Sequence, residues 1–486
     1  MGKNANAKYY LNSVIVVAIM VFFRFLPTVG SMTPLGVTVL GIFIGALYGW
    51  IKCDMVWPSV LAMILLGMTD YVENVSAVFT SAISNFTIQM MIWLLVFSAI
   101  LTVSGISKQL ATRMIRSKFG KGHPWLLSIA IYAAAGIVAA FGGGFAAILI
   151  CWDFTYNIAA QVGYTNKDKW PRMMVISVVV AVCIVACLLP FQVGIAATFG
   201  YLFTAAANAG VEGYTSYNFV TYLLLSSSMI IVSSSIFFVL LKFIIRPDVE
   251  KLKSYSDDTP NEPFTAQQKI AVWALVAMIV LTSVPSMLPA CALKTVLTRI
   301  GTTPIILAIT VVITYLRDKD GKQYFTFQQL GSQGMFWPMM FMVSTAVVVG
   351  GALSTPAMGF TSTIMSIFTP IFQNATPYVF GLVILAVTML LTNMVNNAVA
   401  GAIMVPVMFS FAVSIGANPM AITACTVLAS NMGILLPCAS PSAAMLHSNK
   451  EWTSTKEIFQ VAVLGLIAVL ITIALVGLPL GNILFA

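Results

Sequence analysis

The chain has 486 residues, of which 59% are hydrophobic and only 8% are charged, and its mean hydropathy is +0.97. Soluble domains carry roughly 25% charged residues, so this composition excludes a soluble protein and predicts a polytopic membrane protein. The net charge of +9 is attributed to membrane topology, because Lys and Arg gather on one side of the predicted spans. The seven cysteines lack metal-type spacing and are interpreted as small core residues.

The N-terminal segment, residues 1–50, is predicted to contain the first two transmembrane spans, at 10–27 and 34–50. A span needs about 20 apolar residues, which leaves room for ten to twelve spans in the whole chain. Lys3 and Lys8 precede the first apolar run as they would in a signal peptide. No small-residue cleavage pattern follows, so the run is interpreted as a retained span.

The next segment, residues 51–245, is predicted to hold a re-entrant helical hairpin near 124–160, entered from the cytoplasmic side. Its two apolar arms meet at three consecutive glycines, 142–144, which favour a break in the helix. Close helix packing would instead favour glycines spaced four apart. A basic amphipathic segment, 108–121, precedes the hairpin and is expected to lie along the membrane surface.

Asp153 lies in the second arm of this hairpin and is the carboxylate that we expect inside the membrane. An intramembrane acid is a functional candidate, which makes Asp153 a candidate proton site. Since it is near an arm end, its side chain can equally reach the interface, and both interpretations stay open.

A polar segment, 246–264, is interpreted as a cytoplasmic linker between two halves of the chain. The second half, 265–486, is predicted to hold a hairpin near 376–415, entered from outside. Four polar side chains lie at its tip, 392–397, between two apolar arms that are each expected to be too short to span a bilayer. Such a tip is tolerated only where it is buried in protein or lines a cavity, so it indicates an ion or substrate site. A kinked spanning helix with a hydrogen-bonding Asn pair is the alternative.

The two halves repeat, because a second break follows each hairpin, at Pro190 and at Ser440-Pro441. With the N-terminus inside and eleven spans, all but three of the 24 Lys and Arg residues fall on the cytoplasmic side. The sequence therefore predicts an all-α polytopic protein of the cytoplasmic membrane with 11 transmembrane helices and two re-entrant hairpins. The hairpins form an inverted repeat, and the C-terminus lies outside.

Two hairpin tips and two interrupted spans bring several helix ends to one cavity near the membrane midplane. A helix N-terminus carries roughly +0.5 charge, so it can hold an anion without Lys or Arg. Thr392, Asn396 and Asn397, with a freed carbonyl near Ala439, provide oxygen ligands for a small hard cation. This combination suits an anion bound beside a cation, which favours symport.

The spacing Thr392-x-x-x-Asn396-Asn397-Ala398, ending in Val405-Pro406, resembles the hairpin-tip pattern of the divalent-anion:sodium symporter family. The stretch 436–441 is similar to the second break of that family, which belongs to the ion-transporter superfamily of elevator-type homodimers. The resemblance implies a transporter for a C4-dicarboxylate or a related di- or tricarboxylate, coupled to sodium. It implies that sodium binds at Thr392, Asn396, Asn397 and Ala439. It further implies that the substrate contacts Gly143, Gly144, Asn397, Ala398, Ser440 and Pro441.

The first half departs from the family pattern, since Val138 stands where the second half has Thr392, and Gly142 and Gly143 form the tip. These positions are degenerate equivalents of the sodium ligands, so the ion count and the substrate stay open. An anion exchanger or a proton-coupled transporter using Asp153 are the alternatives. A membrane-embedded enzyme using Asp153 and His447 is a remote one, because no catalytic motif joins them. We expect no enzyme activity, no cofactor other than the coupling ion and no nucleic-acid partner.

Overall fold

The computed structural model describes residues 3–116, 122–140, 144–190, 192–255, 262–287, 291–353, 355–360, 362, 363, 366, 375–395, 397–437 and 439–486. Over these ranges the chain is helical, and its one β contact is an isolated bridge between Arg317 and Gln323. An α-helix pairs its own backbone groups, which an apolar environment requires.

The helices follow one another along the chain with short connections. The helices before the linker are α1 (Lys3–Phe22), α2 (Pro34–Lys52), α3 (Val56–Gly67), α4 (Val75–Ser84), α5 (Phe86–Val103), α6 (Ile106–Ile115), α7 (Pro124–Ala140), α8 (Gly144–Gln161), α9 (Lys169–Val185), α10 (Val193–Asn208) and α11 (Phe219–Leu240). Those after it are α12 (Ala266–Met287), α13 (Ala292–Ile300), α14 (Thr302–Tyr315), α15 (Phe327–Gly334), α16 (Trp337–Leu353), α18 (Pro377–Met394), α19 (Asn397–Ser414), α20 (Pro419–Asn431), α21 (Pro441–Ser448), α22 (Thr455–Thr472) and α23 (Leu478–Leu484). Single turns of π-helix, Leu241–Ile245 and Ile473–Gly477, extend α11 and join α22 to α23.

Six helical stretches of the described chain are long and apolar enough to cross a membrane. They are α1, α2, α11, α18, α19 and the α22–α23 stretch, and two bent pairs, α4 with α5 and α15 with α16, would raise the number to eight. The chain is thus an all-helical polytopic membrane protein, while the total of eleven spans stays a prediction. The expectation that the arms of the second hairpin are too short to span is wrong, because α18 and α19 each have 18 residues.

The two predicted hairpin segments correspond to the helix pairs α7 with α8 and α18 with α19, whose members pack against each other, and their re-entrant insertion stays a prediction. The predicted tip residues 141–143 and Asn396 lie outside the described residues. Thr376 begins the second pair, because its side chain accepts a hydrogen bond from Val379 N and Pro377 occupies the first helical position. The predicted surface segment 108–121 corresponds to α6, and residues 117–121 are not described.

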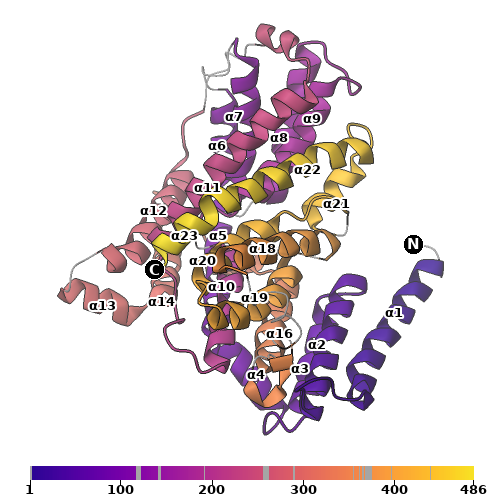
Figure 1. The fold of residues 1–486 in the computed structure, drawn as a ribbon. Coiled ribbons are helices and arrows are strands. Elements are labelled where there is room, and N and C mark those ends of the chain that lie inside the picture. The colour runs from indigo at the N-terminus through magenta and orange to yellow at the C-terminus, as the bar shows by residue number, and fades with distance from the viewer. Residues whose placement is uncertain are drawn as a thin grey trace.

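Most of the helices pack in two groups that both contact α10. Figure 1 shows α7–α9 at one end of the molecule and α2–α4 with α16 at the opposite end. The hairpin group consists of α7–α9, α11 and α18–α23, and the support group of α2–α5 and α14–α16. Helix α10 packs against α19 and α20 of the hairpin group and against α5 and α16 of the support group. Any residue on α10 therefore lies close to the junction of the two groups.

The linker is fastened to the hairpin group at its first end. Lys251 Nζ donates to Gly163 O (2.9 Å), and the Tyr164 hydroxyl donates to Asp248 O (2.8 Å). At the other end, Gln109 Nε2 in α6 donates to Glu262 O (2.7 Å). These contacts hold the described parts of the linker against the turn between α8 and α9 and against α6.

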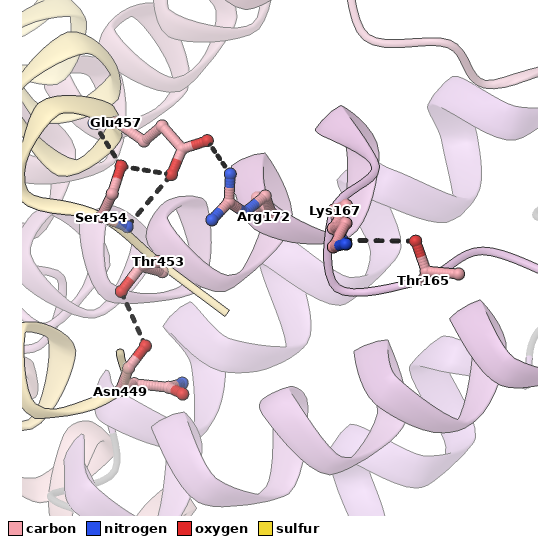
Figure 2. Close-up of polar contacts among 7 residues, drawn as sticks. All are labelled: Thr165, Lys167, Arg172, Asn449, Thr453, Ser454 and Glu457. Carbon is pink, nitrogen blue, oxygen red and sulfur yellow. Dashed lines mark hydrogen bonds and ion pairs between the residues drawn. The ribbon is translucent and has the colours of Figure 1, made fainter. Parts of the chain in front are cut away.

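A polar cluster joins α9 to α22 at the same end (Figure 2). Arg172 forms an ion pair with Glu457, which also closes a capping box with Ser454 at the start of α22. In the turn before α9, Asp168 accepts hydrogen bonds from Thr165 N (2.6 Å) and from the Thr165 hydroxyl (2.9 Å). These bonds stabilise the carboxylate and lower the pKa of Asp168.

Candidate functional site

Asn393 joins the tip of the second hairpin to the break after α20. Its amide nitrogen donates to Met389 O (2.8 Å) and Met432 O (3.0 Å). Its oxygen accepts from Ile434 N (3.0 Å) and Leu435 N (2.8 Å). The side chain is only 5% exposed, and this one amide pairs three backbone groups of the break after α20 and links them to α18.

Several oxygen atoms gather around the neighbouring Asn397 side chain. One end of the Asn397 amide lies 2.9 Å from Thr392 Oγ1, 3.2 Å from Ser430 O and 3.3 Å from Ala439 O. The Thr392 hydroxyl donates to Ser430 O. A methyl group on Gly433 would lie 2.3 Å from Asn397 Oδ1, 3.0 Å from Thr392 O and 3.2 Å from Ala439 O, so only glycine fits there. We call these atoms the oxygen cluster: Thr392 Oγ1 and O, the Asn397 amide oxygen, Ser430 O and Ala439 O.

Either end of the Asn397 amide can face the rest of this cluster. With the nitrogen inward, it donates to the Thr392 hydroxyl, Ser430 O and Ala439 O. With the oxygen inward, the cluster consists of five oxygen atoms. Within the described chain, the Thr392 hydroxyl is the one member of the cluster that can donate a hydrogen bond. Such a set is chemically suited to a small hard cation, because carbonyl, amide and hydroxyl oxygens are ligands of that kind of ion.

A cavity of about 240 Å³ opens beside the oxygen cluster, between α10, α16, α19 and α20. Asn397 and Ser430 belong to both the cluster and the cavity wall, so a ligand in the cavity would lie next to a cation in the cluster. The first turns of three helices also reach the cavity, through Gly194 of α10, Asn397 of α19 and Pro441 of α21. None of the lining residues, all from the described chain, carries a charge.

The structure brings some of the predicted binding residues together and separates others. Thr392, Asn397 and Ala439 meet in the oxygen cluster, and Asn397, Ala398 and Pro441 line the cavity. Asn396, Gly142 and Gly143 lie outside the described residues.

Ser440 lies behind the cavity wall. Its hydroxyl donates to Gly433 O (2.7 Å) and accepts from Ala443 N (3.0 Å), which caps α21. Gly144 starts α8 and faces Val182, and it does not line this cavity.

The remaining candidates from the first half also lie away from the cavity. Val138 is fully buried in α7, and Asp153 is exposed on α8. His447, on α21, places Nε2 3.0 Å from Leu435 O, where it supports the break after α20.

The break in the first half, 186–192, is closed by side-chain donors. Gln192 donates to Ala139 O (3.4 Å) and to Ala140 O, at the end of α7. The carbonyls of the break accept hydrogen bonds from side chains on or just before α11: Cys187 O from Tyr222 (2.8 Å), Leu188 O from Ser226 (2.9 Å) and Pro190 O from Tyr217. These side chains give the carbonyl oxygens of the break a hydrogen-bond donor each.

Sequence reasoning missed several residues of the site. Asn393 is in the predicted tip, and its amide, placed where two helices end, was a usable signal. Ser430 takes part through its backbone carbonyl, and Gly433 takes part because it has no side chain that would clash with Asn397. The residue type therefore does not indicate either role in the sequence.

Neither the scan against protein-family models nor the search of the curated proteins gives a match. Among solved structures, the chain is similar to the YdaH transporter of Alcanivorax borkumensis, whose crystal structure reveals an unusual topology. The two are 12% identical with a TM-score of 0.60, over 92% of this chain and 98% of that chain. At this identity the likeness concerns the fold alone. The chain therefore has the fold of a structurally characterised membrane transporter.

Proposed function

We propose that the protein is a secondary active transporter that carries a small organic anion together with sodium across the cytoplasmic membrane. The observation that carries this proposal is the oxygen cluster beside an uncharged cavity, where two interrupted helices meet. In secondary transporters, discontinuous helices provide the carbonyls for the coupling ion and the N-termini for an anionic substrate. The shared fold with a known transporter supports the same class of function.

Sodium is the cation that fits the composition of the cluster. Its members are carbonyl, amide and hydroxyl oxygens, and no carboxylate is among them. Divalent cations in proteins usually retain carboxylate ligands, so a monovalent ion is favoured. When the cation binds, the Asn397 amide presents its oxygen to the cluster, and without the cation it presents its nitrogen.

The anion is proposed to lie in the cavity, at the N-termini of α10, α19 and α21. The positive ends of these helix dipoles attract negative charge there. The adjacent sodium ion lowers the repulsion that the anion meets on leaving water, which couples the two binding events.

We propose a single sodium site, in the second half of the chain. Tyr217 and Tyr222 donate to carbonyls of the first break, and Gln192 donates to a carbonyl at the end of α7, so donors of the protein already pair these oxygens. Proton coupling through Asp153 lacks comparable support, because Asp153 is exposed and does not line the cavity.

The elevator motion, the homodimer and the eleven-span topology are part of the same proposal. The first two derive from the family resemblance, and the eleven spans derive from the apolar runs and the distribution of Lys and Arg. The position of α10 between the hairpin group and the support group agrees with sliding of one group past the other (Figure 1). The proposed halves keep the predicted boundaries, 51–245 and 265–486, joined by the linker.

Uptake into proteoliposomes tests the proposal. A panel of labelled carboxylates is offered with an inward sodium gradient or with an equal potassium gradient. We expect saturable uptake of at least one carboxylate with sodium and background uptake with potassium. Equal uptake in the two gradients would contradict sodium symport and favour exchange.

A further inference from the structure

The cavity has one apolar wall and one polar wall. The apolar wall comes from the support group and consists of Met55, Phe336, Met339 and Met342. The opposite wall carries amides and hydroxyls, on α10, α19 and α20. Thioether and aromatic side chains pack well against hydrocarbon but cannot pair with a charge.

Tyr201 lies on the polar side and is only 3% exposed. Its hydroxyl has no hydrogen-bond partner within the described chain. The hydroxyl of Thr198, one turn earlier on α10, is already used, since it donates to Gly194 O (2.8 Å). A buried hydroxyl without a hydrogen-bond partner lowers the stability of the folded protein. A ligand in the cavity that accepts a hydrogen bond from Tyr201 would remove this cost.

The packing of α10 against α19 holds the Tyr201 ring beside the cavity. A methyl group on Gly401 of α19 would lie 3.8 Å from Tyr201 Cε2 and 3.7 Å from Thr198 Oγ1, so the two helices approach closely there. Asn397 and Ala398, on the same face of α19 one turn earlier, line the cavity with Tyr201.

We propose that the cavity binds a small carboxylate with one anionic end and an apolar body, and that Tyr201 donates a hydrogen bond to this ligand. This inference rests on the proposed function and narrows its substrate class. The carboxylate lies near Asn397 and the helix N-termini, and the body contacts the methionine wall. A second carboxylate on the same ligand would be buried against that wall without a donor, which is strongly unfavourable. The cavity therefore disfavours the dicarboxylate that the family resemblance implies.

Ligand-dependent thermal unfolding of the purified full-length protein tests the substrate class. The probes are straight-chain monocarboxylates from acetate to octanoate, benzoate, succinate and fumarate, each in sodium chloride and in potassium chloride. We expect monocarboxylates with an apolar body to raise the unfolding temperature in sodium, and the dicarboxylates to leave it unchanged. Stabilisation by succinate or fumarate without stabilisation by monocarboxylates would overturn the inference but leave the proposed function standing. If neither class binds and sodium alone has no effect, both fail.

The Tyr201→Phe variant tests the hydrogen bond, because it keeps the ring and removes only the hydroxyl. We expect about tenfold weaker binding of the best monocarboxylate, as for loss of one hydrogen bond to a charged group. The unliganded variant should unfold at the same or a higher temperature, since an unpaired hydroxyl has been removed. The matched control is Tyr132→Phe, whose hydroxyl lies 3.2 Å from Ser234 Oγ away from the cavity, and its affinity should equal that of the wild type. Unchanged affinity in Tyr201→Phe would overturn the role of Tyr201.

Discussion

The two interrupted regions of the molecule satisfy their freed backbone groups in opposite ways. In the first, at 186–192, carbonyls accept hydrogen bonds from nearby hydroxyls, and the Gln192 amide donates to the end of α7. In the second, at 432–440, Asn393 supports the break, and the carbonyls of Ser430 and Ala439 converge with Thr392 on the Asn397 amide. Side-chain donors pair the carbonyls of one region, while in the other region oxygen atoms converge on one amide. On the proposed function, the two halves therefore keep similar helix breaks while a cation site is present in only one.

The largest expected effect on stability comes from Asn393→Ala. This change removes four hydrogen bonds at once and leaves buried backbone groups of the break after α20 without partners. We expect a loss of roughly 3–5 kcal/mol, from a cost of about 1–3 kcal/mol for each unsatisfied buried group with partial relaxation. Thermal unfolding in detergent measures it. A loss below that of Tyr222→Phe would mean that Asn393 does not hold the second region together.

The second effect, on sodium binding, is expected for Gly433→Ala. The added methyl group would lie 2.3 Å from Asn397 Oδ1 and 3.0 Å from Thr392 O, so the oxygen cluster must open. We expect loss of the sodium-dependent rise in unfolding temperature, together with an overpacking cost of about 1–3 kcal/mol. Gly331→Ala is the matched control, because nothing lies within 4 Å of a methyl group there. A normal sodium response in Gly433→Ala would show that the cluster is not the cation site.

A smaller effect is expected in the first region for Tyr222→Phe. The change leaves Cys187 O without the donor that lies 2.8 Å away, at a cost of about 1–2 kcal/mol. Sodium affinity should stay at the wild-type value, since the first region binds no cation in this account. A changed sodium affinity would contradict the proposal that only the second region binds sodium.

The smallest effect is expected for Asp168→Asn, in the turn before α9 and away from both breaks. The hydrogen bonds from Thr165 lower the pKa of Asp168 in the folded protein, so the carboxylate stabilises the fold above its unfolded pKa of about 3.9. That contribution to stability is lost as the pH falls through the lower pKa that Asp168 has in the folded protein. The variant should therefore be slightly less stable than the wild type at neutral pH and equally stable at strongly acidic pH, as thermal unfolding across pH would show. If the variant were still less stable than the wild type at strongly acidic pH, the ionised carboxylate of Asp168 would not be the cause of the difference.

The hairpins could be predicted from the sequence because their tips interrupt long apolar runs with polar residues or glycines. Thr392, Asn397 and Ala439 meet as expected, since helix breaks at a hairpin tip and in a neighbouring helix expose carbonyls at the same place. The sequence analysis underestimates the lengths of the arms. The hydroxyls of Thr388 and Thr392 donate hydrogen bonds to carbonyls of the protein, so these polar residues lie inside α18 and do not end it.

The parts that escaped prediction depend on tertiary contacts. Gln192 carries no motif, and its role becomes visible only when it reaches the end of α7. Gly433 is needed for the space that it leaves next to Asn397. In the sequence, Tyr201 looks like any other tyrosine in an apolar helix. The feature that marks it as a candidate ligand donor is its hydroxyl, which has no hydrogen-bond partner in the described structure.

Equilibrium binding of radioactive sodium to the purified protein tests the central claim most directly. The account predicts saturable binding of one sodium ion per chain, and loss of that binding in Asn397→Ala, which removes the amide oxygen from the cluster while Asn393 still supports the fold. Absence of saturable binding to the wild-type protein, or equal binding to Asn397→Ala, would contradict it.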